Sequence, residues 1–375
     1  MLQAVAENIA IARRGPEISV VVPTFNERDN VELLVDKIEK ALGGEAWEVV
    51  FVDDDSTDGT RDVINRMSQR DPRVRCIHRI GRRGLSSAVI EGMLSTSSPF
   101  IAVMDADLQH DEAILPDMLA NLRRGGADVV IGSRYASGGG VGEWDGTRQS
   151  YSRFATMLSK MVLKADVSDP MSGFFMTTRE ALYGSVRGLS LRGYKVLLDL
   201  LASSSKPLKT AELPYQFRTR VHGESKLDTM VAIEFLEMLL DKTIGKIVPT
   251  TFIMFMAVGG AGVLVHFAVL SVSMFAFGQQ FAMGQTIAAV VAMTFNFFVN
   301  NLLTYRDRRL KGFWPVVRGL ATFYAVCGLG LFANVGIANY MFAQNSSWWL
   351  AAIAGILVGA VWNFAASKVF TWRGA

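Results

Sequence analysis

The chain has 375 residues, of which half are hydrophobic and 19% are charged, and its formal net charge is +3. This apolar excess excludes an ordinary soluble protein and predicts a membrane part. The net charge is too small to indicate a protein that binds nucleic acid. The two cysteines, Cys76 and Cys327, are far apart and indicate no disulfide framework, so a reducing compartment is expected.

Residues 1–16 are expected to form an N-terminal tail. They lack the pattern of a signal peptide, because Glu7 interrupts the apolar stretch and Arg13 and Arg14 stand at its far end. Residues 17–228 mix polar, apolar and turn residues and are long enough to bury a core of their own. Long apolar runs dominate beyond residue 247. We therefore expect a soluble domain followed by a membrane domain.

Four short apolar runs in the first domain are predicted to be β-strands. They are residues 18–22, 47–52, 100–104 and 129–131. Segments with helical patterns separate them, which indicates an α/β sheet of parallel strands. In such sheets, ligands bind beyond the carboxyl ends of the strands.

Acidic segments follow three of these predicted strands. They are Pro23-Thr24-Phe25-Asn26-Glu27, the run from Asp53 to Gly59, and Asp105-Ala106-Asp107. Two carboxylates separated by one residue at a strand end can bind the same hard cation, to which Gln109 adds an oxygen. We therefore predict that Asp105, Asp107 and Gln109 bind Mg²⁺ or Mn²⁺, which would act on a diphosphate leaving group.

The other acids have different interpretations. A lone Asp-x-Asp is usually a solvated turn, and only its place after a buried strand favours metal binding here. Asp53 and Asp55 are suited to accept hydrogen bonds from the base or ribose of a nucleotide. Asp58-Gly59 is more typical of turn chemistry than of catalysis.

Residues 229–248 are predicted to form an amphipathic helix. Its apolar residues at helical spacing are Ile233, Leu236, Leu239 and Leu240, with charged residues between them. The pattern fits a helix at the membrane interface. A helix that packs on the soluble domain is the alternative.

Four apolar stretches in residues 249–375 are each long enough to cross a bilayer as a helix. They cover about residues 250–275, 281–303, 316–340 and 348–370. Basic residues gather between the second and third stretches and at the C-terminal end, whereas the connections at 278–280 and 344–346 hold none. The positive-inside rule therefore predicts a multi-pass protein whose first domain and both termini are cytoplasmic.

The membrane domain repeats itself at an offset of about 67 residues, which predicts two related helical hairpins. Residues 255–262 recur at 323–330, and residues 296–306 recur at 363–373. Small residues in the repeat suit close packing of helices in lipid. For Asn296, Asn300, Asn334 and Asn363, interhelical hydrogen bonds are favoured over a path for lipid headgroups.

Seven segments between residues 17 and 228 point to a known family. They are Pro23 to Glu27, Asp53 to Thr60, Gly84 to Ser86, Asp105 to His110, Gly132 to Tyr135, Asp169 to Phe175 and Arg220 to Leu227. Together they resemble the dolichol-phosphate mannose synthases, which are family 2 glycosyltransferases with a Rossmann-like GT-A fold. The membrane domain resembles the GtrA-like module of four helices that some of these enzymes carry. The chain departs from the family at Asp111-Glu112, where many members have two prolines. The residue at which the next helix begins is therefore not predicted.

The resemblance implies transfer of a hexose from a nucleotide-sugar to a polyprenyl phosphate. Mannose from GDP-mannose is the implied donor, and glucose from UDP-glucose is the competing one. The implied nucleotide-sugar site is Pro23, Thr24, Glu27, Asp53, Asp55, Asp105 and Asp107, and the implied catalytic residues are Asp105, Asp107 and Arg220. The implied acceptor-phosphate site is Arg134, Arg148, Ser152, Arg220 and Lys226. An anionic phosphate indeed requires arginine forks and lysine charges.

A phosphate monoester is largely dianionic at neutral pH and can attack C1 of the sugar without a general base. Direct displacement with inversion at C1 is therefore predicted, through a transition state with oxocarbenium character. A processive polysaccharide synthase is a weaker alternative, because the chain lacks the Gln-x-x-Arg-Trp segment of that group. A lipid flippase or a scaffold is a second alternative. The intact acids favour an enzyme and leave an added transport role open.

Overall fold

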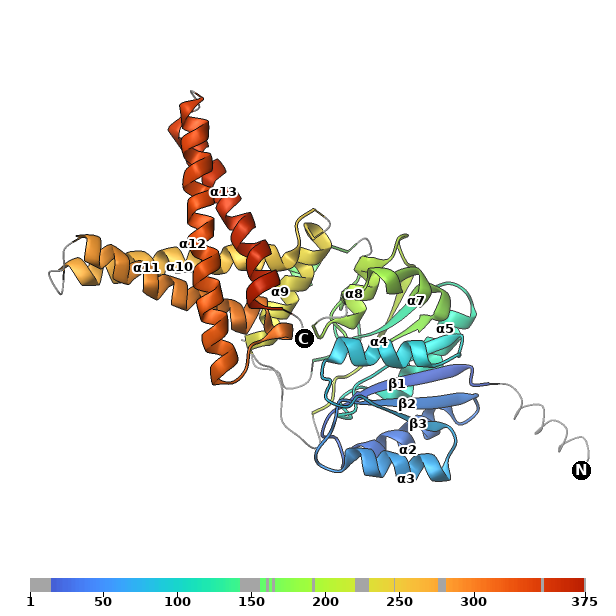
Figure 1. Cartoon of the computed structure of the whole chain (residues 1–375). Helices are drawn as coiled ribbons and strands as arrows, with labels where there is room; N and C mark the ends of the chain where they lie inside the picture. The colour runs from blue at the N-terminus through green and yellow to red at the C-terminus, as the bar shows by residue number, and fades with distance from the viewer. Residues whose placement is uncertain are drawn as a thin grey trace, which may run out of the picture. The chain divides into compact units, whose positions relative to one another are not determined.

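The computed structural model describes residues 15–141, 156–159, 162–163, 166–190, 193–219, 229–245, 247–275, 281–344 and 347–373. The chain forms two compact units, Met1–Thr243 and Ile244–Ala375 (Figure 1). Most of the predicted N-terminal tail lies outside the described residues.

The first unit contains a sheet to which seven strands of the described chain contribute. The strands are β1 (Ile18–Thr24), β2 (Trp47–Asp53), β3 (Val74–His78), β4 (Phe100–Val103), β5 (Val129–Ser133), β6 (Phe175–Thr178) and β7 (Thr210–Pro214), in the order β3-β2-β1-β4-β6-β5-β7. The four predicted strands are confirmed as β1, β2, β4 and β5. These four strands run parallel to one another, as expected. The sheet as a whole is mixed, because β6 lies between β4 and β5 and is antiparallel to both.

Helices cover both faces of this sheet (Figure 1). One face packs against α2 (Val31–Leu42), α3 (Thr60–Arg70) and α5 (Leu115–Arg123), and the other against α4 (Leu85–Ser95), α7 (Arg179–Ser185) and α8 (Val196–Ser203). All seven residues of β1 and of β2 are buried. Burial on both faces explains why these strands are mainly apolar rather than alternating. Their buried polar residues Ser19 and Glu48 hydrogen-bond to each other.

The predicted interface helix is α9 (Thr229–Thr243), and it packs on the first unit. Its residue Lys242 places Nζ 2.6 Å from Oδ1 of Asp199 in α8, and Asp199 has no exposed surface. Met238 and Leu239 are buried, whereas Leu236 is 50% exposed. Packing on the soluble domain is therefore present, and contact with a membrane surface stays a prediction.

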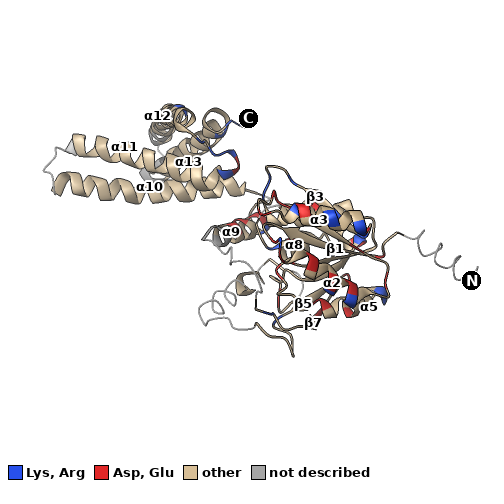
Figure 2. Ribbon diagram, turned by 90° about the horizontal axis from the view of Figure 1, so that it is seen from below, with Lys and Arg blue, Asp and Glu red and all other residues tan. Residues whose placement is uncertain are grey.

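The described part of the second unit has four helices that are long and apolar enough to cross a membrane. They are α10 (Thr250–Phe275), α11 (Phe281–Val299), α12 (Phe313–Ala343) and α13 (Trp348–Ala366), which agree with the four predicted stretches. Helices α10, α11 and α13 carry no Lys, Arg, Asp or Glu (Figure 2). A helix that crosses the core of a bilayer must have no charged side chain on any face exposed to lipid.

The internal repeat is visible in the backbone as well as in the sequence. Helix α11 continues into a π-helical segment, Asn300–Thr304, and α13 continues into a second one, Ser367–Thr371. The two segments begin 67 residues apart, at equivalent positions of the two hairpins. The predicted relation between the hairpins is confirmed, although the π-helical segments themselves were not predicted.

Equivalent residues of the two hairpins meet in the core of the second unit. The rings of Tyr305 and Trp372, which each follow a π-helical segment, stack with centroids 4.1 Å apart and an interplanar angle of 10°. Phe255, Phe297 and Phe323 complete this aromatic core. Stacked and edge-on aromatic pairs add stability beyond the apolar area that they bury. The core therefore joins the two hairpins at their equivalent ends.

Two glycines allow the helices within each hairpin to approach closely. A Cβ atom at Gly262 would overlap the carboxamide of Asn296, and one at Gly330 would overlap the carboxamide of Asn363. The Oδ1 atoms of Asn296 and Asn363 are buried and have no hydrogen-bond partner in the described part of the chain. The predicted interhelical hydrogen bonds are thus replaced, at these two oxygens, by close packing against glycine.

We expect Gly262→Ala and Gly330→Ala each to lower the stability of the full chain in detergent by about 1–3 kcal/mol, because the added methyl group overpacks the hairpin. Gly260→Ala and Gly328→Ala are matched controls on the same helices, since a Cβ at either position meets no atom within 4 Å. Thermal unfolding of the four variants in detergent measures these differences in stability. Equal shifts for all four variants would show that helix propensity, not packing, determines the effect.

Candidate active site

The acidic segments meet at one edge of the sheet. Thr24 at the end of β1 pairs with Asp53 at the end of β2. The Met104 N–H donates to the carbonyl of Val21 in β1, which extends the pairing beyond β4 and brings Asp105 to the same edge. The carboxyl ends of β1, β2 and β4 therefore place the predicted nucleotide and metal residues together.

The predicted metal residues lie on a tight turn after β4. Leu108 has a positive φ of 62°, and the Gln109 N–H donates to Oδ1 of Asp107 over 3.2 Å. The side chain of Asp105 is 40% exposed, whereas only 7% of the surface of Asp107 is exposed. Two carboxylates and one carboxamide on a single turn form a donor set of oxygens that suits Mg²⁺ or Mn²⁺.

His110 orients Asp105 through a hydrogen bond to its backbone. Its Nδ1 accepts the Asp105 backbone N–H over 3.1 Å, so the ring proton is on Nε2, which lies 3.8 Å from Oδ2 of Asp105. The ring stacks on Phe174 with centroids 5.2 Å apart. Burial lowers the pKa of His110 to about 4, so the ring is neutral at pH 7. His110 is therefore an orienting residue, a role that the sequence did not predict.

The buried neutral ring predicts a pH dependence of stability. An unfolded chain binds a proton at histidine near pH 6.5, whereas folded His110 does so near pH 4. The contribution is therefore complete above pH 6.5 and is lost as the pH falls toward 4, by about 3 kcal/mol. The check is the difference in unfolding free energy between the wild type and His110→Asn, a variant that keeps an acceptor but does not titrate. A difference that stays constant from pH 7 to pH 4 would contradict the assignment.

Arg218 connects the segment after β7 to the turn that follows β4. Its backbone N–H donates to the carbonyl of Gln109 over 2.9 Å, and Nε2 of Gln109 donates to the carbonyl of Arg218 over 3.0 Å. Its guanidinium donates to Asp111 and Glu112, each over 2.6 Å. The Asp111 carboxylate also accepts the Ala113 N–H and caps the short helix Glu112–Ile114, which leads into α5. Asp111 and Glu112 stand where many members of the resembled family have two prolines. In this chain they begin the short helix and bind the Arg218 guanidinium.

Arg134, at the end of β5, is held in a buried ion pair. Its Nε and Nη2 donate to the two carboxylate oxygens of Asp169 over 2.7 and 2.8 Å, and its backbone N–H donates to the same carboxylate over 3.1 Å. The side chains are 10% and 0% exposed. Burial opposes the charge of Arg134, but the hydrogen bonds to Asp169 outweigh it and raise the pKa of Arg134. Sequence reasoning did not identify this partner.

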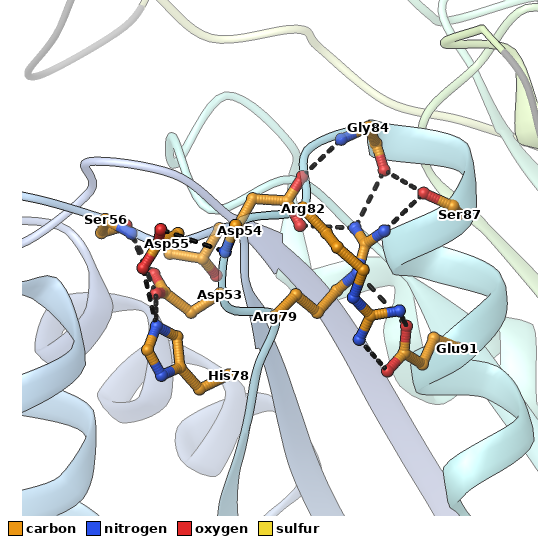
Figure 3. Close-up of polar contacts among 12 residues, drawn as sticks. Asp53, Asp54, Asp55, Ser56, His78, Arg79, Arg82, Gly84, Ser87 and Glu91 are labelled. Atoms are coloured by element: carbon orange, nitrogen blue, oxygen red, sulfur yellow. Dashed lines mark hydrogen bonds and ion pairs between the residues drawn. The ribbon is translucent and has the colours of Figure 1, made fainter. Parts of the chain in front are cut away.

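Asp53 and Asp55 differ in exposure and in partners (Figure 3). Asp53 is fully buried and accepts hydrogen bonds from the Ser56 N–H and hydroxyl over 3.1 and 2.5 Å. The side chain of Asp55 is 43% exposed, and its oxygens meet the Gly81 N–H and His78 Nε2. The Gly81 N–H and the His78 ring hold the pKa of Asp55 below its usual value. Of the two acids, Asp55 is the one that presents a carboxylate to solvent.

The neighbouring Asp54 has a structural role (Figure 3). Its carboxylate accepts hydrogen bonds from Arg79 over 2.5 Å and from the Gly84 N–H over 2.7 Å. Arg79, which is 3% exposed, also donates to Ser87 in α4 over 2.6 Å. This network fixes the connection between β3 and α4 beside the carboxyl end of β2.

The remaining predicted nucleotide residues lie at the end of β1. Pro23 and Thr24 are in the strand, and the Thr24 hydroxyl donates to the carbonyl of Val22. The Glu27 N–H donates to the Thr60 hydroxyl over 2.9 Å. Asp58 accepts from the Thr60 N–H at the start of α3, which confirms turn chemistry for that acid. The predicted acceptor residues Arg148, Ser152, Arg220 and Lys226 lie outside the described residues.

Two protein families match this chain. Glycosyl transferase family 2 matches residues 19–184, and the GtrA/DPMS transmembrane domain matches residues 254–372. The fold of the first unit, the acidic turn after β4 and these two family matches together define a membrane-bound glycosyltransferase of family 2 with a GT-A domain.

Curated relatives narrow the class further. A dolichol-phosphate mannosyltransferase of Pyrococcus furiosus is 34% identical over 364 residues, which cover 95% of this chain and 99% of the relative. One from Mycosarcoma maydis is 36% identical and covers 60% of this chain and 79% of the relative; one from Saccharomyces cerevisiae is 34% identical and covers 64% and 91%. The chain belongs to the dolichol-phosphate mannosyltransferase family, as the seven segments predict.

Glucosyl-3-phosphoglycerate synthase from Mycobacterium tuberculosis is among the solved structures that match this chain. Its complex with phosphoglyceric acid has a TM-score of 0.45 and 22% identity, over 64% of this chain and 83% of that one. Its complex with Mn²⁺, UDP-glucose and phosphoglyceric acid has the same TM-score and coverage and 21% identity.

Proposed function

We propose that this enzyme transfers mannose from GDP-mannose to a polyprenyl phosphate at the cytoplasmic face of the membrane. The observation that carries the proposal is the 34% identity to a dolichol-phosphate mannosyltransferase over 95% of this chain. The architecture is consistent with it. A site with clustered oxygen donors belongs to a chain that also has four helices able to cross a membrane, so a water-soluble donor and a lipid acceptor are both accessible to one protein.

The metal proposal rests on the turn after β4. Asp105, Asp107 and Gln109 offer oxygens only, and neutral His110 holds the Asp105 backbone in place. No cluster of three or more His, Cys, Asp or Glu that could hold a metal occurs in the described ranges. The cation therefore depends on Gln109 and on oxygens of the donor as well as on the two acids. When bound, Mg²⁺ or Mn²⁺ supplies Lewis-acid stabilisation of the leaving diphosphate.

The nucleotide proposal assigns different roles to the residues after β1 and β2. Exposed Asp55, oriented by His78 and Gly81, accepts hydrogen bonds from the nucleotide. Buried Asp53 shapes the same loop through Ser56. Pro23, Thr24 and Glu27 line the end of β1 beside them. This division follows from exposure, because Asp55 presents its carboxylate to solvent, whereas the Asp53 carboxylate is buried and already accepts two hydrogen bonds from Ser56.

The acceptor proposal concerns the predicted basic residues and Ser152. Arg134, Arg148, Ser152, Arg220 and Lys226 would hold the acceptor phosphate, with Arg134 kept rigid by Asp169. The phosphate dianion attacks C1 directly, the bond to the nucleotide diphosphate breaks, and the configuration at C1 is inverted. The cytoplasmic orientation is proposed from the basic residues between α11 and α12.

The test is transfer of radiolabel into the organic phase. Purified full-length protein is incubated with Mg²⁺ or Mn²⁺, polyprenyl phosphate and labelled GDP-mannose, UDP-glucose or other nucleotide-sugars in parallel. We expect metal-dependent transfer from GDP-mannose. Transfer from UDP-glucose alone would overturn the sugar assignment, and no transfer from any donor by folded protein would overturn the proposed reaction.

A further inference from the structure

The second unit contains a pocket whose lining includes none of the residues proposed for the transfer reaction. Its volume is about 590 Å³, and it lies where the end of α11 meets the connection to α12 and the first turns of α12. Phe298, Val317 and Leu320 form its apolar wall, and Arg309 and Lys311 stand on the connection that borders it. The pocket thus combines an apolar surface with two cations.

The cationic border is held in a fixed conformation by Asn301. Its Oδ1 accepts the Leu310 N–H over 2.9 Å, and its Nδ2 donates to the carbonyl of Leu310 over 3.2 Å. Trp372 Nε1 also donates to this Oδ1 over 2.9 Å, and both Asn301 and Trp372 are buried. The side chain of Leu310 packs against the aromatic core, whereas Arg309 and Lys311 on either side of it are exposed.

The residues around the pocket indicate that it lies at the boundary between membrane and water. The connection carries Arg306, Arg308, Arg309 and Lys311 with a single acid, Asp307. Phe313 and Trp314, which begin α12, are 72% and 76% exposed. Exposed aromatic rings beside basic residues are typical of the headgroup level of a bilayer. An apolar wall continuing from there toward the helices would face acyl chains.

We propose that this pocket binds one anionic glycerophospholipid. Its phosphate lies between Arg309 and Lys311, and an acyl chain lies along Phe298, Val317 and Leu320. Two cations favour a lipid with net negative charge over a zwitterionic one, and the apolar wall distinguishes a lipid from free phosphate. Glycerophospholipid is favoured over polyprenyl phosphate because it is the anion that a bilayer presents in bulk at its cytoplasmic surface.

The experiment titrates detergent-solubilised full-length protein with phosphatidylglycerol and measures bound lipid by native mass spectrometry. Phosphatidylcholine, polyprenyl phosphate and inorganic phosphate are titrated in parallel. We expect one phosphatidylglycerol to bind with a Kd at least about tenfold below that of phosphatidylcholine, and Arg309→Gln/Lys311→Gln to raise that Kd about tenfold. The matched control is Arg308→Gln/Arg318→Gln, which removes the same charge from residues that do not line the pocket and should change the Kd less than about threefold.

A second variant, Val317→Trp, fills the apolar wall and leaves both cations and Asn301 unchanged. We expect it to weaken phosphatidylglycerol binding while thermal unfolding shows a folded protein. Equal losses in the pocket and control variants would indicate diffuse attraction and would overturn the proposal. Preference for polyprenyl phosphate, or competition by inorganic phosphate at equal concentration, would overturn the assignment to glycerophospholipid.

Discussion

Replacing either Asp105 or Asp107 by Asn is expected to lower kcat/KM for sugar transfer about a thousandfold or more. Both carboxylates lie on the turn after β4, and each substitution removes a negative charge while it preserves the shape of the side chain. A carboxamide binds a divalent cation far more weakly than a carboxylate. The leaving diphosphate would then lose most of its electrostatic stabilisation.

The control for this prediction is Asp117→Asn, which removes an exposed carboxylate from α5. Activity is measured by label transfer over a range of Mn²⁺ concentrations, and folding by thermal unfolding without metal. A variant of Asp105 or Asp107 that keeps wild-type activity at every metal concentration would contradict the metal site. An equal loss in Asp117→Asn would point to a general effect of charge.

The acidic turn after β4 could be recognised in the sequence because the residues that define it are local, and metal binding by this turn stays a prediction. Asp105, Asp107 and Gln109 lie within five residues of one another after a buried apolar strand. The interactions that support the turn are not local. Gln109 bonds to Arg218, which is 109 residues away, and Arg134 bonds to Asp169, which is 35 residues away. No periodicity or spacing in one sequence encodes such pairs, so the side chains that orient the site were missed.

The same distinction explains which strands were predicted. β1, β2, β4 and β5 are buried on both faces and appear as apolar runs. β7 has no buried residue and includes Glu212, so its pattern is that of a loop. β6 has four residues and is antiparallel to its neighbours, an orientation that its sequence does not reveal. In the membrane domain, self-similarity predicted the hairpins, because a repeat is a signal independent of local propensity.

The second large effect concerns the stability of the first unit. Asp169→Asn is expected to lower the unfolding free energy by about 3–5 kcal/mol, because it leaves the Arg134 guanidinium buried without its counter-charge. Chemical unfolding of the full chain in detergent measures this. The control is Glu17→Gln, which breaks the pair between Arg123 and Glu17, whose side chains are 38% and 36% exposed. That change should cost about 1 kcal/mol or less.

A double variant separates the structural role of this pair from its proposed role with the acceptor. Arg134→Met/Asp169→Leu replaces both charges by apolar groups and should regain at least about half of the lost stability, since no unpaired charge stays buried. If Arg134 holds the acceptor phosphate, the regained stability will not restore activity, and KM for polyprenyl phosphate will rise. A stable double variant with wild-type KM would show that Arg134 serves only to hold the end of β5 against Asp169.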